Sequence, residues 1–155
     1  KAVAFGEALT LEFNQYQENV VENARGLAES LMGLGFKLVT DGTDNHLMLV
    51  DLRPQGLTGR TAQVELDKVN LTTNKNAIPY DPQPPSVASG IRVGTPSITT
   101  QGMQESEMKE VAGLISRAVR DEDGSAAAEI RAGVDMLVEA HPAYPRAAEP
   151  TQQSR

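Results

Sequence analysis

Apolar residues recur at intervals of three and four over the first quarter of the chain. This spacing places them on one face of a helix, so residues 13–34 are predicted to form a long amphipathic helix. Gly33 and Gly35 stand where the pattern stops, as expected at a helix end. The positions that define the face are Phe13, Tyr16, Val20, Ala24, Leu27, Leu31 and Leu34.

The pattern then changes to that of extended strands. Residues 36–40 (FKLVT) alternate and include β-branched side chains, which predicts a strand. Residues 41–45 have the composition of a turn. Residues 46–51 (HLMLVD) are apolar at consecutive positions, and a strand with two apolar faces is typical of the centre of a sheet.

Thr58 occupies a typical N-cap position, and the apolar spacing after it predicts a short helix ending near residue 69. Residues 70–90 are polar and contain four prolines, so they are predicted to form a long loop. Loops of this length within a domain are usually functional or disordered. A short strand over residues 91–94 and two amphipathic helices over 108–119 and 130–138 complete the prediction.

This order of elements predicts an α+β fold, with one small sheet of few strands and helices packed on one side. The order of the strands in the sheet stays open. We expect residues 1–35 to form a long helix leading into the domain, residues 36–145 to form the domain, and residues 146–155 to be a disordered tail. The chain starts at Lys1, and residues 1–9 have the composition of the inside of a structured element, so we expect it to be part of a longer protein.

The chain has 155 residues, a net charge of -7 and no cysteine. The negative charge argues against a nucleic-acid partner, which needs clustered Lys and Arg. It leaves room for a small anionic ligand, because one arginine can dominate a local site. Without cysteine there is no disulfide or thiolate metal site, and the two histidines lack metal-ligand spacing, so we predict no metal. No apolar run reaches membrane-spanning length, so no membrane partner is expected.

Arg92 is the first candidate for a binding residue. It lies on a short predicted strand between Gly90 and Gly94, which allow close approach of a backbone or a ligand. A guanidinium held on a rigid strand suits the capture of a carboxylate through two hydrogen bonds. The alternative is an ordinary ion pair with a nearby Asp or Glu, and the residues alone leave both interpretations open.

The segment Asn74–Lys75–Asn76 opens the predicted loop. Amide side chains donate and accept hydrogen bonds, which suits a heterocycle with alternating nitrogens and carbonyls, although asparagine is also common in loops. Lys75 is the lysine to consider as a Schiff-base former. That role needs a pKa depressed by burial, and a lysine between two asparagines is expected to be solvated, so we reject it.

Four blocks of the sequence resemble serine hydroxymethyltransferase, in the same order and spacing. They are KAVAFGEAL from residue 1, TDNHLMLVDLRPQGLTG from 43, NKNAIPYDPQPP from 74 and SGIRVGTPSITTQG from 89. The resemblance extends to about Leu114, and HPAYP near the end is similar to the terminus of many bacterial members. Members often carry an aromatic residue and a threonine where this chain has Ser86 and Ala88.

The resemblance implies the C-terminal domain of a fold-type I pyridoxal-phosphate enzyme, related to aspartate aminotransferase. Such an enzyme interconverts serine plus tetrahydrofolate and glycine plus 5,10-methylenetetrahydrofolate. Arg92 would bind the substrate carboxylate and Asn76 the folate. The catalytic residues and the cofactor lysine would lie upstream, so the resemblance implies that this chain alone is inactive. It also implies a cytoplasmic enzyme that is a homodimer or a larger oligomer.

Two other functions are to be weighed. The first is an aminotransferase or decarboxylase of the same fold type, which also carries a carboxylate-binding arginine in this region. The NKNAIP segment favours a folate enzyme over both. The second is a non-catalytic regulatory or interaction module, which would need no upstream domain.

Overall fold

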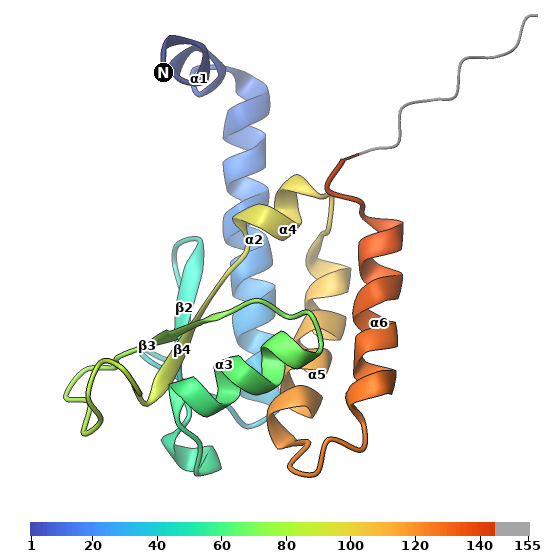
Figure 1. The fold of residues 1–155 in the computed structure, drawn as a ribbon. Helices are drawn as coiled ribbons and strands as arrows, with labels where there is room; N and C mark the ends of the chain where they lie inside the picture. Colours follow the sequence, from blue (N-terminus) through green and yellow to red (C-terminus); the bar gives the residue numbers. More distant parts are fainter. Residues whose placement is uncertain (145–155) are drawn as a thin grey trace, which may run out of the picture.

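A computed structural model describes residues 1–144, and it shows a four-stranded antiparallel sheet (Figure 1). The strands follow the order β1–β2–β4–β3 across the sheet. β2 and β4 are therefore the inner strands, which confirms the prediction that residues 46–51 run through the middle of the sheet. The strands are β1 (Lys37–Leu38), β2 (Leu47–Asp51), β3 (Asn74–Asn76) and β4 (Gly90–Gly94).

All four helices predicted from the apolar spacing are present. The long helix α2 begins where the Thr10 hydroxyl accepts a hydrogen bond from the Phe13 N–H, at 3.2 Å, and it gives way to Gly35 in a left-handed conformation. Thr58 caps α3 in the same way, through the Thr61 N–H at 3.1 Å. The helices are α1 (Ala2–Glu7), α2 (Leu11–Gly33), α3 (Gly59–Lys68), α4 (Pro96–Thr100), α5 (Glu105–Arg120) and α6 (Ala127–Ala140), with a short 3₁₀ turn at Arg53–Gln55.

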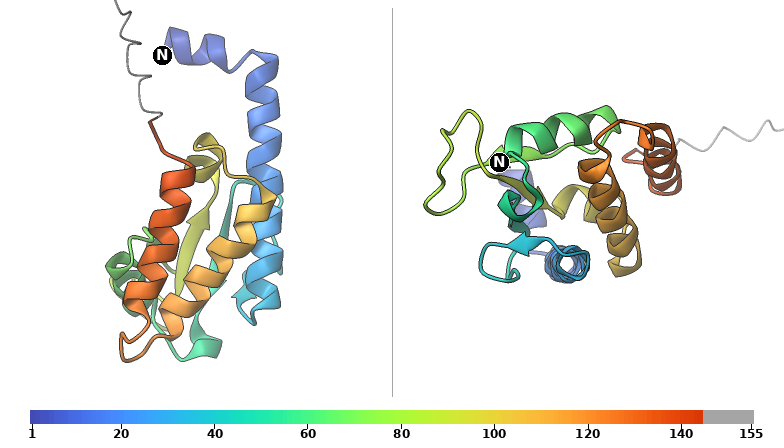
Figure 2. Two further views of the ribbon diagram at one scale, coloured as in Figure 1. Left: turned by 90° about the vertical axis from the view of Figure 1, so that its right-hand side faces the viewer. Right: turned by 90° about the horizontal axis from the view of Figure 1, so that it is seen from below.

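The helices cover one face of the sheet. Met48 pairs with Val93 and Val50 pairs with Ile91, and all four side chains are buried. They form one continuous core with the apolar faces of α2, α3, α5 and α6, and α6 packs against α5 (Figure 2). The α+β prediction, with helices on one side of a small sheet, is therefore confirmed.

Three local predictions differ from the structure. Residues 74–76 form the edge strand β3, where a loop was predicted, because the sequence NKN carries no strand signal and only its pairing with β4 makes it extended. Pro96 starts the short helix α4, which was not predicted, at the first helical position that suits proline. β1 has two residues, where five were predicted.

A buried polar seam joins α2 to the segment that follows β4. The Thr95 hydroxyl donates to the Val20 carbonyl at 2.7 Å. The Asn23 amide donates to the Thr99 hydroxyl and to the Met103 carbonyl, both at 2.9 Å. Because unpaired polar groups are costly in a core, these bonds define how α2 and the end of β4 meet.

The N-terminal arm, which we define as residues 1–11, projects beyond the rest of the described structure (Figure 1). The expected helix of residues 1–35 consists of α1 and α2, joined at residues 8–10. Four large apolar side chains of the arm are 69–87% exposed: Val3, Phe5, Leu9 and Leu11. The predicted tail, residues 146–155, lies outside the described residues. No helix within residues 1–144 is both long and apolar enough to cross a bilayer.

Candidate functional site

The face of the sheet opposite the helices, here called the open face, carries both candidate residues. Arg92 is paired with Asn74, and Gly90 is paired with Asn76. Since side chains alternate along a strand, Arg92, Asn74 and Asn76 all leave the sheet on the face opposite the buried Ile91. Asn76 is the diagonal neighbour of Arg92 on the adjacent strand, a position about 7–8 Å away in antiparallel sheets.

Arg92 is exposed beside a hollow of about 540 Å³ between the ends of β2 and β3. Among residues 1–144 its guanidinium has no ion-pair partner, whereas Arg53 pairs with Asp51 and Arg117 with Glu129. The alternative interpretation, in which Arg92 forms an ordinary ion pair with a nearby Asp or Glu, therefore finds no such carboxylate within the described chain. The hollow is lined by His46, Leu47, Thr72, Thr73, Asn74, Arg92 and Gly94.

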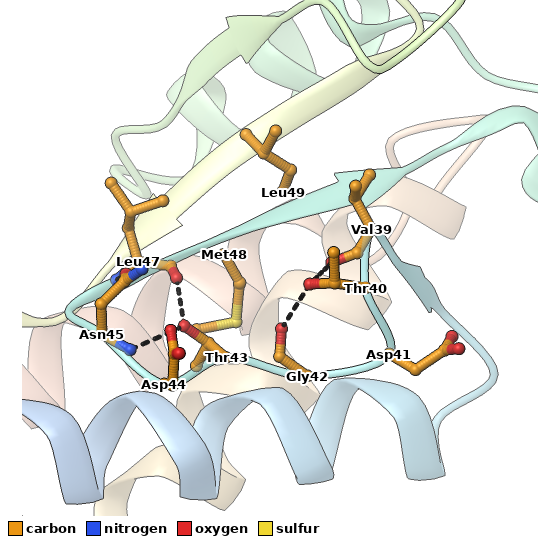
Figure 3. A pocket seen from close by; sticks show the side chains of 10 residues that line it. All are labelled: Val39, Thr40, Asp41, Gly42, Thr43, Asp44, Asn45, Leu47, Met48 and Leu49. Atoms are coloured by element: carbon orange, nitrogen blue, oxygen red, sulfur yellow. Dashed lines mark hydrogen bonds between the residues drawn. The ribbon is translucent and has the colours of Figure 1, made fainter.

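Apolar side chains extend the open face next to Arg92. Val39, Leu47 and Leu49 point to the same side of the sheet, whereas Met48 points toward α2 (Figure 3). Val39, Leu47 and Leu49 are half-buried, and they line a second hollow, of about 670 Å³, along residues 39–49. Leu49 is paired directly with Arg92. The guanidinium thus stands between apolar side chains on one flank and the asparagine amides of β3 on the other.

Asp51 is the acidic residue of the four strands, and its carboxylate is already paired with Arg53. Asp51 pairs with Gly90 across β2 and β4, and its side chain is 4% exposed. It accepts hydrogen bonds from three groups of Arg53: the backbone N–H at 3.1 Å, Nε at 3.0 Å and a terminal nitrogen at 2.8 Å. The bonds from the Arg53 side chain lower the pKa of Asp51 against the opposing effect of desolvation. Asp51 is therefore neutralised by Arg53 and leaves Arg92 unpaired.

Asn76 lies at the end of β3 and is half-buried, with its amide nitrogen donating to the Ala77 carbonyl at 2.7 Å. Its side-chain oxygen accepts no hydrogen bond within the described residues. Of the two positions that depart from the family pattern, Ser86 is exposed, whereas Ala88 is buried in a left-handed conformation with φ +57°. Ala88 therefore differs from the family pattern at a buried position of the loop, where the side chain affects packing.

Sequence reasoning did not single out two acidic residues, Asp51 and Asp81. Asp51 could have been found, since the spacing Asp-x-Arg in a strand-to-turn segment favours a local ion pair. Asp81 accepts two hydrogen bonds from Ser89, eight positions further along the chain, and no local pattern predicts these. Of the predicted site residues, the structure brings Arg92 and Asn76 together on one face.

The lysines of the chain do not fit a covalently bound pyridoxal phosphate. A Schiff-base lysine needs a desolvated amine, yet none of the five lysines is buried, and all lie within the described residues. Lys75 is half-buried, but it pairs with Ile91 and so leaves the sheet on the side of the helices, away from Arg92. Within residues 1–144 no group of three His, Asp or Glu residues could hold a metal ion.

A family model described as serine hydroxymethyltransferase matches residues 1–115. The chain belongs to the serine hydroxymethyltransferase family. The match includes the N-terminal arm, all four strands and the open face, and it ends within α5. The resemblance found in the four sequence blocks is thereby confirmed, and the family membership indicates a pyridoxal-phosphate-dependent transferase.

The ion pair of Asp51 leads to a prediction about acid stability. A carboxylate whose pKa is lower in the folded than in the unfolded chain stabilises the fold above its unfolded pKa of about 3.9. That stabilisation is lost as the pH falls through the folded pKa. We expect Asp51→Asn to be less stable than the wild type at pH 7, and to lose less further stability between pH 5 and pH 3. Urea unfolding at the two pH values measures this.

Asp135, exposed on α6 and free of ion pairs within residues 1–144, provides the control. Asp135→Asn is expected to keep the wild-type stability at pH 7 and the wild-type dependence on pH. If Asp51→Asn showed the same pH dependence as the wild type, Asp51 would not be a source of the acid sensitivity.

Proposed function

We propose that this chain forms the substrate-binding side of a serine hydroxymethyltransferase that interconverts serine plus tetrahydrofolate and glycine plus 5,10-methylenetetrahydrofolate. The observation that carries the proposal is Arg92, on an inner strand of a sheet matched by the family model, with no ion-pair partner in the described chain. An unpaired guanidinium next to apolar side chains favours an anionic ligand over a neutral one.

Arg92 binds the α-carboxylate of serine or glycine in this proposal. Two parallel N–H···O bonds hold a carboxylate in one plane, so the amino acid is oriented as well as bound. β4 is bonded to β2 on one side and to β3 on the other, and Thr95 ties its end to α2, so the arginine starts from a fixed backbone. The contribution to catalysis is the positioning of the bond that breaks.

Asn76 contacts the folate in this proposal. Its side-chain oxygen, which has no donor within the described residues, is available to an N–H group of a pterin ring. Because Asn76 is diagonal to Arg92, a folate bound there lies next to the amino acid held by Arg92. This proximity is what transfer of a one-carbon group between the two ligands needs.

The remainder of the site is assigned to residues outside this chain. We infer this from the absence of a buried lysine among the five in the sequence. The N-terminal arm, with its four exposed apolar side chains, fits a segment that is covered by an upstream domain. The proposal includes the properties implied by the family: pyridoxal phosphate as cofactor, tetrahydrofolate as co-substrate, a homodimer or larger assembly, and a cytoplasmic location.

The isolated 155-residue chain is expected to be inactive and to bind no pyridoxal phosphate covalently. After incubation with the cofactor and borohydride reduction, mass spectrometry should find no site that is labelled above the level of a denatured control. A single lysine labelled stoichiometrically, together with turnover of serine, would overturn this part of the proposal.

The role of Arg92 is tested by Arg92→Lys in the full-length enzyme. Lysine keeps the charge but loses the planar pair of donors, so kcat/KM for serine is expected to fall about 10- to 100-fold, as for one or two lost charge-assisted bonds. The cofactor is expected to stay bound, as measured by its absorbance. Arg131→Lys, on the exposed side of α6, is the matched control and should have wild-type kinetics. Wild-type serine kinetics in Arg92→Lys would contradict the role of Arg92 in binding the substrate carboxylate.

The role of Asn76 is tested by Asn76→Ala in the same enzyme. Removal of one hydrogen bond is expected to raise the Kd for tetrahydrofolate about 3- to 10-fold and to leave the Kd for glycine nearly unchanged. Asn14→Ala, on the exposed side of α2, is the control. Equal effects on both ligands would contradict a folate-specific contact. An enzyme in which tetrahydrofolate had no effect on glycine binding would instead fit an aminotransferase.

A further inference from the structure

Asp81 lies in the loop of residues 77–89, which joins β3 to β4, and its carboxylate accepts four hydrogen bonds from that loop. One oxygen accepts from the Ile78 N–H at 3.1 Å and from the Ser89 N–H at 2.8 Å. The other accepts from the Gln83 N–H at 2.9 Å and from the Ser89 hydroxyl at 2.6 Å. Both oxygens of the carboxylate are thus fully engaged by groups of the protein.

The donors belong to the two ends of the loop. Ile78 follows Asn76 by two residues, and Ser89 directly precedes β4 and is three residues before Arg92. Ile78 is 5% exposed and Ser89 is 3% exposed, so both donor residues are buried, whereas Asp81 itself is half-buried. One side chain therefore ties together the two backbone segments that carry the candidate site residues.

The carboxylate remains ionised in this setting. Desolvation raises the pKa of Asp81, but the hydrogen bonds from the Ser89 hydroxyl and from the N–H groups of Gln83, Ser89 and Ile78 outweigh it. Together they hold the pKa well below its usual range. The tie is therefore intact at any pH at which the enzyme would work.

Backbone N–H groups of Leu52, Gly59 and Arg60 hold the C-terminal end of the loop, at residues 87–89. The Asp81 carboxylate joins that end to Ile78, at the start of the loop. Tyr80 and Ala88 adopt left-handed backbone conformations, with φ of +55° and +57°, which non-glycine residues rarely take without support from their surroundings. β3 has three residues, lies at the edge of the sheet and pairs with β4 alone. It is held there by three residue pairs with β4, by the Gln63 side chain of α3, which accepts a hydrogen bond from the Lys75 N–H at 3.1 Å, and by the loop that follows.

We propose that Asp81 is a positioning residue of the substrate site. By holding Ile78 and Ser89 together it sets the separation between Asn76 and Arg92, and hence the coupling between the folate and the amino-acid carboxylate. This inference rests on the function proposed above. It concerns a residue that need not contact either ligand.

The test is Asp81→Asn in the full-length enzyme. Asparagine keeps one acceptor oxygen and places an N–H₂ group against N–H donors, so the loop ends should separate. The Kd for glycine and the Kd for tetrahydrofolate are both expected to rise, and kcat/KM for serine is expected to fall about 10- to 100-fold, as for a displacement of about 1 Å. The factor by which saturating tetrahydrofolate tightens glycine binding is expected to fall toward 1.

Asp123→Asn is the matched control. Asp123 also accepts a hydrogen bond within a loop, from the Ser125 N–H at 3.0 Å, but it lies between α5 and α6. This variant should keep both Kd values and the coupling factor. Ser89→Ala is the milder second variant, since it removes the hydroxyl and keeps the backbone bond to Asp81. It is expected to shift the same constants in the same direction by about threefold, and it remains informative if Asp81→Asn fails to fold.

Wild-type Kd values and coupling in Asp81→Asn, or in Ser89→Ala if only that variant folds, would overturn the proposal even if the Tm fell, because a merely structural role lowers stability alone. Arg92→Lys distinguishes a failure of the positioning role of Asp81 from a failure of the proposed function. Loss of serine cleavage in Arg92→Lys, with unchanged constants in the Asp81 and Ser89 variants, would remove only the positioning role. Unchanged kinetics in Arg92→Lys would remove the proposed function itself.

Discussion

The alternation of side chains along β4 determines which face of the sheet Arg92 occupies. Ile91 and Val93 are buried against the helices, so Arg92 between them has to leave the sheet on the opposite face. A shift of β4 by one residue would bring the arginine into an apolar core and the two apolar residues into water. The burial of the core thus enforces the register that presents the guanidinium, and the same register places Asn76 on the neighbouring strand.

The nearby carboxylates of Asp51 and Asp81 are held by groups other than Arg92. The chain is acidic overall, with 21 Asp and Glu against 14 Lys and Arg, yet Arg92 has no carboxylate partner within residues 1–144. Asp51, which is on the adjacent strand, is held by Arg53, and Asp81 is held by backbone and hydroxyl donors. Each carboxylate is satisfied by a group other than Arg92, and this keeps the arginine available for an external anion.

Family membership and the geometry of the sheet both support the proposal that this chain carries part of a larger site. The region matched to serine hydroxymethyltransferase carries a carboxylate-binding candidate and a folate-binding candidate, but its lysines are all at least partly exposed. In the function proposed above, the chemistry of the cofactor belongs to residues outside this chain. The exposed apolar side chains of the N-terminal arm and the half-buried Leu47 and Leu49 of the open face are surfaces that such residues could cover.

The sequence by itself determined the elements whose signals are local. The apolar spacing of α2, the cap at Thr58 and the two apolar faces of β2 each follow from side chains a few positions apart, and Arg92 stood out by its setting between two glycines. The tertiary structure alone decided the pairing of β3, the order of the strands and the role of Asp81. These depend on backbone groups brought together from distant positions: NKN becomes a strand only against β4, and a carboxylate becomes a tie only where both ends of a loop meet it. Hydrogen bonds of this kind leave no periodic pattern in the chain, because any residue except proline can supply the N–H.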